Sequence, residues 1–190
     1  MYLKIALLLI ASASSMSRAT TLGLDVTGSS EFIATGKPGF IKIDGLGNGL
    51  IGKLNVSGTL VSGQMSFPLN ALDTGVSLRD KHMKEEYLEV QKFPEAQLSI
   101  NQVKLAANPV TEGFSQAKVP FEGILEVHGT KHSVNGFIDL KTNSQITSGD
   151  AHFAIKISDF GFVEPKFMGM KVNDDVEVKV HIDAKKAKLE

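Results

Sequence analysis

The sequence predicts an all-β protein whose strands form an antiparallel barrel. Apolar and polar residues alternate with a period of two along most of the chain, as in strands with one buried face. Short connections rich in Gly, Asn and Asp separate these runs, and about eight or nine runs can be counted. An antiparallel sheet of this size can remove its exposed edges by closing on itself, so we expect a barrel of eight strands.

Residues 1–19 have the features of a secretory signal peptide. Lys4 precedes the apolar run IALLLIA, and Ser17-Arg18-Ala19 has the small-x-small pattern of a cleavage site. The apolar run is about half as long as the roughly 20 residues that span a bilayer, so we expect no stable membrane insertion. Cleavage after Ala19 would leave residues 20–190 as a single exported domain.

The composition narrows the classes of partner. The chain has 20 basic and 21 acidic residues, a formal net charge of -1, and no basic block, which argues against nucleic-acid binding. It has no cysteine, so the exported domain must be stabilised by packing instead of disulfides. These features leave open whether two barrels pair as a homodimer.

The predicted strands follow from the alternation, and the turns follow from clusters of turn-forming residues. Turns are expected at GLGNG (45–49), NPVTEG (108–113) and TNSQITSGD (142–150). The alternating runs are 31–35, 39–43, 53–60, 64–69, 97–105, 118–128, 132–140, 151–158 and 176–183.

One segment favours a helix. Residues 77–90 contain no proline, are rich in helix formers, and place apolar residues at a partly helical spacing. We expect one or two short helical turns over a barrel mouth, with Pro94 helping to restart the extended chain.

Eight strands can enclose either a packed interior or one small ligand. Small residues at interior positions favour a cavity, although they also relieve crowding in curved strands. The chain has eleven phenylalanines and no tryptophan, and the small residues are Gly123, Gly136, Ala151 and Ala154.

Several motifs match known sites in letters alone. Residues 47–52 read GxGxxG, but a strand-like run follows them instead of the helix that a dinucleotide site requires, so we expect a glycine-rich hairpin. The triplet 159–161 and the Ser115-x-x-Lys118 pair lack the companion motifs of kinases and penicillin-binding enzymes. His128 and His132 flank a two-residue turn, yet no established zinc spacing accompanies them, so we predict no metal site.

The sequence Arg79-Asp80-Lys81-His82 offers two interpretations. It could act as an acid–base site, but the chain has no serine elbow and no cysteine nucleophile. Alternatively, Arg79 and Asp80 form a charge-assisted pair that holds a turn. We favour the structural interpretation and predict no enzymatic activity and no cofactor.

The stretch LDTGVSLRDKHMKEEYLEVQKFPEAQLSI (72–100) closely resembles the signature of the YceI-like family. The resemblance continues in GILEVHGTKH (123–132), SDFGF (158–162) and DDVEVKV (174–180) and covers nearly all of residues 20–190. It implies an extended antiparallel barrel similar in shape to lipocalins, located in the periplasm, whose interior holds a long isoprenoid chain or isoprenoid quinone. Residues 30–40 depart from the opening that is frequent in the family.

With this resemblance, we expect the protein to bind or carry a long apolar lipid without changing it. The alternative is a stress-related interaction protein whose barrel is filled by side chains. The expected ligand-binding residues form a polar turn and an apolar lid at the mouth, together with lining positions on the strands and the 161–170 loop. They are Arg79, Asp80, His82, Met83, Tyr87, Leu88, Phe93, Phe121, Leu125, Phe137, Phe153, Ile155, Phe162, Phe167 and Met168.

Overall fold

A computed structural model describes residues 21–37, 41–163, 165–167 and 169–187. The expected signal peptide (1–19), Met168 and the terminal Leu189-Glu190 lie outside these residues. Strands account for most of the described chain. They are β1 (Thr21–Lys37), β2 (Ile41–Ser57), β3 (Leu60–Pro68), β4 (Glu95–Lys104), β5 (Ser115–Val127), β6 (Thr130–Asn143), β7 (Ile146–Lys156), β8 (Lys166–Phe167), β9 (Met170–Val172) and β10 (Asp175–Lys186).

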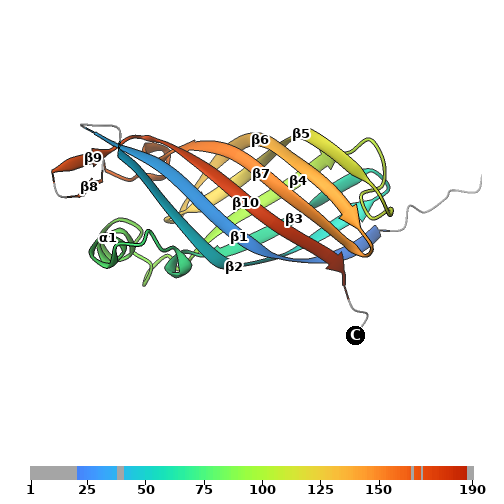
Figure 1. The fold of residues 1–190 in the computed structure, drawn as a ribbon, viewed down its shortest axis with the longest axis horizontal. Coiled ribbons are helices and arrows are strands. Elements are labelled where there is room, and N and C mark those ends of the chain that lie inside the picture. The colour runs from blue at the N-terminus through green and yellow to red at the C-terminus, as the bar shows by residue number, and fades with distance from the viewer. Residues whose placement is uncertain (1–20, 38–40, 164, 168, 188–190) are drawn as a thin grey trace, which may run out of the picture.

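Eight of these strands close into an antiparallel barrel, which confirms the predicted fold class. The order around the barrel is β10-β7-β6-β5-β4-β3-β2-β1, and pairing of β10 with β1 closes it. The short β8–β9 hairpin is attached through β9 to the end of β1. The long, tilted strands give an elongated barrel (Figure 1).

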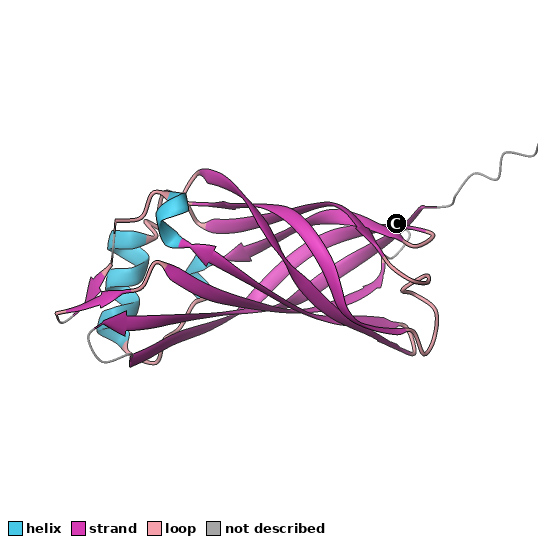
Figure 2. Cartoon of the chain, turned by 90° about the horizontal axis from the view of Figure 1, so that it is seen from above, coloured by secondary structure: helices cyan, strands magenta, loops and turns pink. Residues whose placement is uncertain are grey.

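The helical segment lies where the sequence predicts it. After the turn η1 (Leu69–Ala71), the helix α1 (Ser77–His82) continues into the π-helical turn η2 (Met83–Tyr87). These elements and the β8–β9 hairpin lie at one end of the barrel, which we call the mouth, and the C-terminal end of β10 lies at the other (Figures 1 and 2). Among the described residues, no helix has the length and apolar character needed to cross a bilayer.

The glycine-rich stretch 45–52 is not a turn or a hairpin, which corrects the sequence prediction. β2 runs through it without a break, and the connection to β3 is the turn at residues 58–59. The glycines serve close packing instead, because a Cβ atom at Gly45 would lie 2.3 Å from the ring of Phe32, and one at Gly47 would lie 2.6 Å from the ring of Phe67. Two interior aromatic rings therefore lie directly over the backbone of β2.

The predicted turn at 142–150 is also mostly strand. β6 continues to Asn143 and β7 begins at Ile146. The buried hydroxyls of Thr142 and Thr147 both donate hydrogen bonds to the carbonyl of Pro109. These bonds hold the 105–114 loop across the end of the barrel opposite the mouth, where Phe114 is buried.

Candidate functional site

The barrel interior opens toward the mouth in a cavity of about 250 Å³, which we call the mouth cavity. Side chains from β1, β2, β3, β4, β5, β7 and β10 form its walls, and the helical segment covers it. Most of the lining is apolar. The polar lining residues are Ser30, Ser66, Thr74, Arg79, His82, Tyr87 and Lys166, and no carboxylate among the described residues belongs to the lining.

The polar turn at the mouth is built around Thr74. The Thr74 amide and hydroxyl donate hydrogen bonds to the Asp80 carboxylate at 2.9 and 2.6 Å. The Arg79 guanidinium donates to the Thr74 hydroxyl and to the Thr74 carbonyl, both at 2.8 Å. The expected Arg79–Asp80 pair is therefore mediated by Thr74, which the sequence analysis left out of the site.

Asp80 belongs to this turn and does not line the mouth cavity. Partial burial alone would raise the pKa of Asp80, but hydrogen bonds from the Thr74 side chain and backbone outweigh this effect, and the pKa is lowered. A carboxylate stabilised in its charged form is poorly suited to act as a general base near neutral pH. Arg79 and His82 do reach the cavity lining, as expected.

Three of the four residues expected in the apolar lid lie against the mouth cavity. Met83, Tyr87 and Leu88 all line the mouth cavity. The amide of Leu88 donates to the carbonyl of Met83 at 2.8 Å, which closes the wide π turn. The Tyr87 hydroxyl accepts from the Lys166 amide at 2.9 Å and donates to the Lys166 carbonyl at 3.1 Å, so the lid is tied to β8.

Phe93, which the sequence analysis places in the apolar lid, packs beside the mouth and does not line the cavity. Its ring packs on the His128 ring at a centroid distance of 4.5 Å, and Phe162 packs on His128 at 5.0 Å. The His128 Nε2 lies 2.6 Å from the Glu89 carboxylate. Of the two aromatic residues, Phe162 lines the mouth cavity and Phe93 does not.

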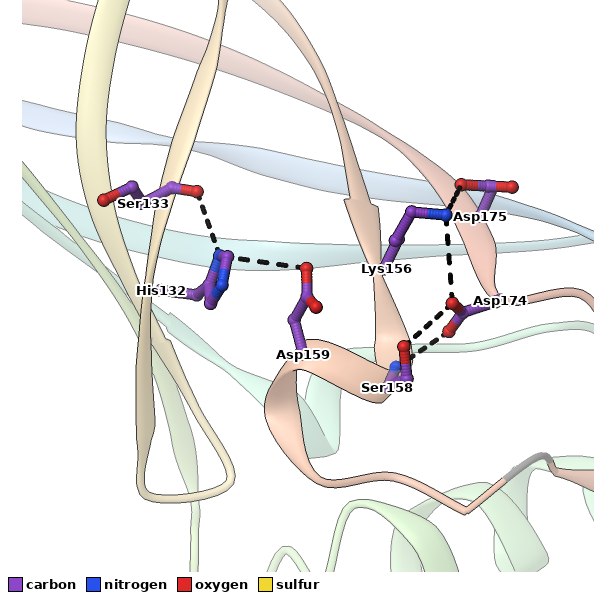
Figure 3. Close-up of polar contacts among 7 residues, drawn as sticks. All are labelled: His132, Ser133, Lys156, Ser158, Asp159, Asp174 and Asp175. Atoms are coloured by element: carbon purple, nitrogen blue, oxygen red, sulfur yellow. Dashed lines mark hydrogen bonds and ion pairs between the residues drawn. The ribbon is translucent and has the colours of Figure 1, made fainter.

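The two histidines that flank the β5–β6 turn do not converge. His132 faces the Ser133 carbonyl and the Asp159 carboxylate, at 3.2 and 3.8 Å (Figure 3). The described residues contain no group of three histidine, cysteine or carboxylate side chains arranged to hold a metal ion.

A polar network fixes the rim on the side of η3 (Ile157–Phe160). Asp174 accepts hydrogen bonds from the Ser158 amide and hydroxyl, both at 2.8 Å, and Lys156 lies 3.0 Å from Asp175 and 4.0 Å from Asp174 (Figure 3). The Ser158 amide is the main cause of a lowered pKa for Asp174, and the bond to Asp175 raises the pKa of Lys156. The network holds the turn that delivers Phe162 to the cavity.

The lining residues that were expected on the strands fall into three groups by their position in the structure. Leu125, Phe153 and Ile155 line the mouth cavity, and Phe121 lines a second, smaller cavity described below. Phe137 is 43% exposed and stacks on His152 on the outer face of the barrel, which corrects its expected place in the lining. The Phe167 side chain and Met168 are outside the described part of the structure.

The first half of the chain contributes cavity residues that the sequence analysis missed. All of the ligand-binding residues expected from the sequence lie at or after residue 79. The signal was the interior alternation in β1, β2 and β3, together with glycines that make room for rings. The missed residues include Phe32, Ala34, Ile43, Leu50, Phe67, Leu69 and Leu72.

The comparisons with known proteins agree with this geometry. A family model described as the YceI-like domain matches residues 23–184. The chain belongs to the YceI-like family. No curated protein is significantly similar to this YceI-like chain.

Solved structures share the fold of this YceI-like domain at low sequence identity. A polyisoprenoid-binding domain from Saccharophagus degradans is 14% identical with a TM-score of 0.70, covering 87% of this chain and 99% of that one. BcnA from Burkholderia cenocepacia is 18% identical with a TM-score of 0.65, covering 82% and 96%. A YCEI protein from Campylobacter jejuni is 14% identical with a TM-score of 0.56, covering 98% and 92%.

Proposed function

We propose that the protein binds a long apolar lipid, a polyisoprenoid or an isoprenoid quinone, in the barrel interior and carries it without chemical change. The observation that supports this most strongly is the mouth cavity, an apolar space whose basic side chains, Arg79, His82 and Lys166, come from the helical segment and β8 at the mouth. Such a site suits an amphiphile whose chain enters the barrel while its head stays near Arg79, His82 and Lys166. The relative from Saccharophagus degradans is described as polyisoprenoid-binding, which supports the same ligand class.

Burial of the chain would supply the affinity. Removing apolar surface from water stabilises by roughly 25 cal/mol per Å², so each prenyl unit inside the barrel adds to the binding free energy before ordering costs. The lining is already assembled from strands of a closed barrel, which keeps the ordering cost on the protein side small.

The alternative, an interaction protein with a side-chain-filled barrel, is less consistent with this interior. A filled barrel would leave no cavity of about 250 Å³ behind the mouth. An enzymatic role for the polar turn is disfavoured because the Asp80 carboxylate and the Arg79 guanidinium are both engaged by Thr74.

We place the protein in the periplasm, exported by the signal peptide expected at residues 1–19. An exported lipid carrier needs to shield its cargo from water, and the lid tied to β8 by Tyr87 fits this task. The lipid then exchanges at the mouth end.

Native mass spectrometry of the gently purified protein, followed by organic extraction, tests this proposal. We expect a stoichiometric adduct that extracts as a prenyl lipid, and the same spectrum reports whether two barrels pair. Phe153→Ala, which removes a ring from the mouth cavity, should reduce loading, whereas Phe137→Ala removes the same ring from the outer face and should not. A protein that stays bare after incubation with isoprenoid quinones would overturn the proposal.

A further inference from the structure

The barrel interior contains a second cavity beyond the first. This distal cavity has a volume of about 70 Å³ and lies toward the end that the 105–114 loop closes. Its lining is apolar apart from Thr147 and includes Leu24, Val56, Val103, Phe121 and Ile182.

Three side chains, Met65, Leu98 and Val180, line both cavities and so form the partition between them. Met65 on β3 and Leu98 on β4 are direct cross-strand partners. Val180 lies on β10, and the order of strands around the barrel places three strands between β4 and β10 in either direction. The partition therefore reaches inward from two opposite walls of the barrel.

Met65 is the part of the partition that is best able to move. Its unbranched thioether side chain has three rotatable bonds and adapts to irregular spaces. Its cross-strand neighbour on β2 is Gly52, and a Cβ atom there would lie 2.7 Å from the Met65 Cγ. The glycine thus leaves room for Met65 to lie against the wall. The three side chains of the partition are all apolar, and the hydroxyl of Ser30, the cross-strand partner of Val180, lies beside them.

We propose that the distal cavity is a subsite for the far end of a long prenyl chain, and that Met65 controls entry to it. This inference rests on the proposed lipid-binding function and adds a selection by chain length. A short chain fills the mouth cavity alone and leaves the partition in place. A longer chain displaces Met65 and buries its last units in the distal cavity.

The aromatic pair beside the partition fits this arrangement. Phe153 lines the mouth cavity and Phe121 lines the distal cavity, and their rings meet edge to face at a centroid distance of 6.0 Å. A chain that passes Met65 exchanges contact with the Phe153 ring for contact with the Phe121 ring. Affinity should therefore rise in two stages with chain length, instead of growing evenly with each unit.

Binding of farnesol, geranylgeraniol and solanesol, three prenyl alcohols of increasing length, tests the inference in the wild type and two variants. Met65→Ala and Val180→Ala open the partition from opposite walls, so either one serves if the other fails to fold. In both, the affinity for solanesol relative to farnesol should rise by at least about tenfold, because burying two more methylene groups is sufficient for that gain. Ile155→Ala, which enlarges the mouth cavity away from the partition, should change the affinities for all three alcohols by similar factors.

The outcomes separate the inference from the function on which it rests. An unchanged solanesol-to-farnesol ratio in both partition variants would overturn the inference and leave lipid binding intact. Absence of binding of all three alcohols and of isoprenoid quinones by the wild type would overturn the proposed function and the inference with it.

Discussion

The Thr74 hydroxyl lies between Asp80 and Arg79, donating to the first at 2.6 Å and accepting from the second at 2.8 Å. One hydroxyl thus satisfies an anion and a cation that are adjacent in the sequence. Because its hydrogen is directed to Asp80, its lone pair is free for the guanidinium. The charged turn at the mouth is therefore held by a neutral side chain five and six residues upstream.

Thr74→Val removes this hydroxyl while keeping the shape of the side chain. We expect the free energy of unfolding to fall by about 1–2 kcal/mol, since two hydrogen bonds to charged groups are lost at a half-buried site. Urea denaturation measures this change. Thr74→Ser keeps the hydroxyl and should remain close to the wild type, whereas a Thr74→Val protein as stable as the wild type would show that the hydroxyl does not hold the turn.

The sequence predicted the barrel and the lid because both depend on local patterns. Period-two alternation identified one-face-buried strands, and Met83, Tyr87 and Leu88 line the cavity from a segment with helical spacing. The alternation also placed Phe137 opposite Val134, a buried residue, so its exposed position was already indicated. Phe137 therefore was the lining candidate that the alternation supported least.

The errors arose where contacts distant in sequence decide the structure. GLGNG is typical of a turn, and what keeps it extended is packing of Phe32 and Phe67 on the backbone of β2. Likewise, the partner of Asp80 could not be chosen from sequence, since Arg79 and Thr74 both lie within reach of the same turn. Neither the extended conformation of residues 45–49 nor the partner of Asp80 has a signature in the neighbouring residues.

The glycines of β2 should differ in their tolerance of alanine. At Gly47 the new Cβ would lie 2.6 Å from the Phe67 ring and 2.8 Å from the Ala71 carbonyl oxygen, and the backbone of η1 cannot easily withdraw. Gly47→Ala should therefore destabilise by about 1–3 kcal/mol. At Gly45 the three atoms nearest to the Cβ all belong to the Phe32 ring, so Gly45→Ala should cost less, because the ring can turn into the mouth cavity.

Thermal or urea unfolding of the two alanine variants tests this order. Gly45→Ala should in addition lower lipid loading, since the displaced Phe32 ring occupies cavity space. Equal stabilities for the two variants would contradict the account of β2 as a strand shaped by two different neighbours.

The bond between Tyr87 and β8 should control opening of the lid. Tyr87→Phe removes both hydrogen bonds to the Lys166 backbone, and a loss of about 1 kcal/mol corresponds to roughly fivefold more frequent opening. Hydrogen exchange of the 165–172 segment should accelerate by that factor. Lys166→Ala keeps the backbone atoms that Tyr87 contacts and should leave the exchange rate unchanged. Equal acceleration in both variants would show that the Lys166 side chain holds the hairpin.

The rim network predicts a loss of stability in acid. The folded state lowers the pKa of Asp174 below its ordinary value of 3.8, chiefly through the Ser158 amide and hydroxyl. A carboxyl whose pKa is lowered by folding stabilises the protein above its unfolded pKa, and this contribution is lost as the pH falls through the folded pKa. Asp174→Asn should be less stable than the wild type at neutral pH, and the difference should shrink as the pH falls below about 4.

Asp175→Asn is the matched comparison, because Asp175 lies beside Asp174 and bonds to Lys156 at the surface, with 79% of its side chain exposed. An exposed ion pair contributes little to stability, so this variant should follow the wild-type curve of unfolding free energy against pH. Hydrogen exchange of the Phe160 and Phe162 amides, measured at neutral pH, should rise in Asp174→Asn alone, since only Asp174 accepts hydrogen bonds from Ser158 at the base of their turn. Parallel curves for all three proteins below pH 5 would mean that the charge of Asp174 does not hold the rim, and that the buried Phe160 ring alone fixes η3.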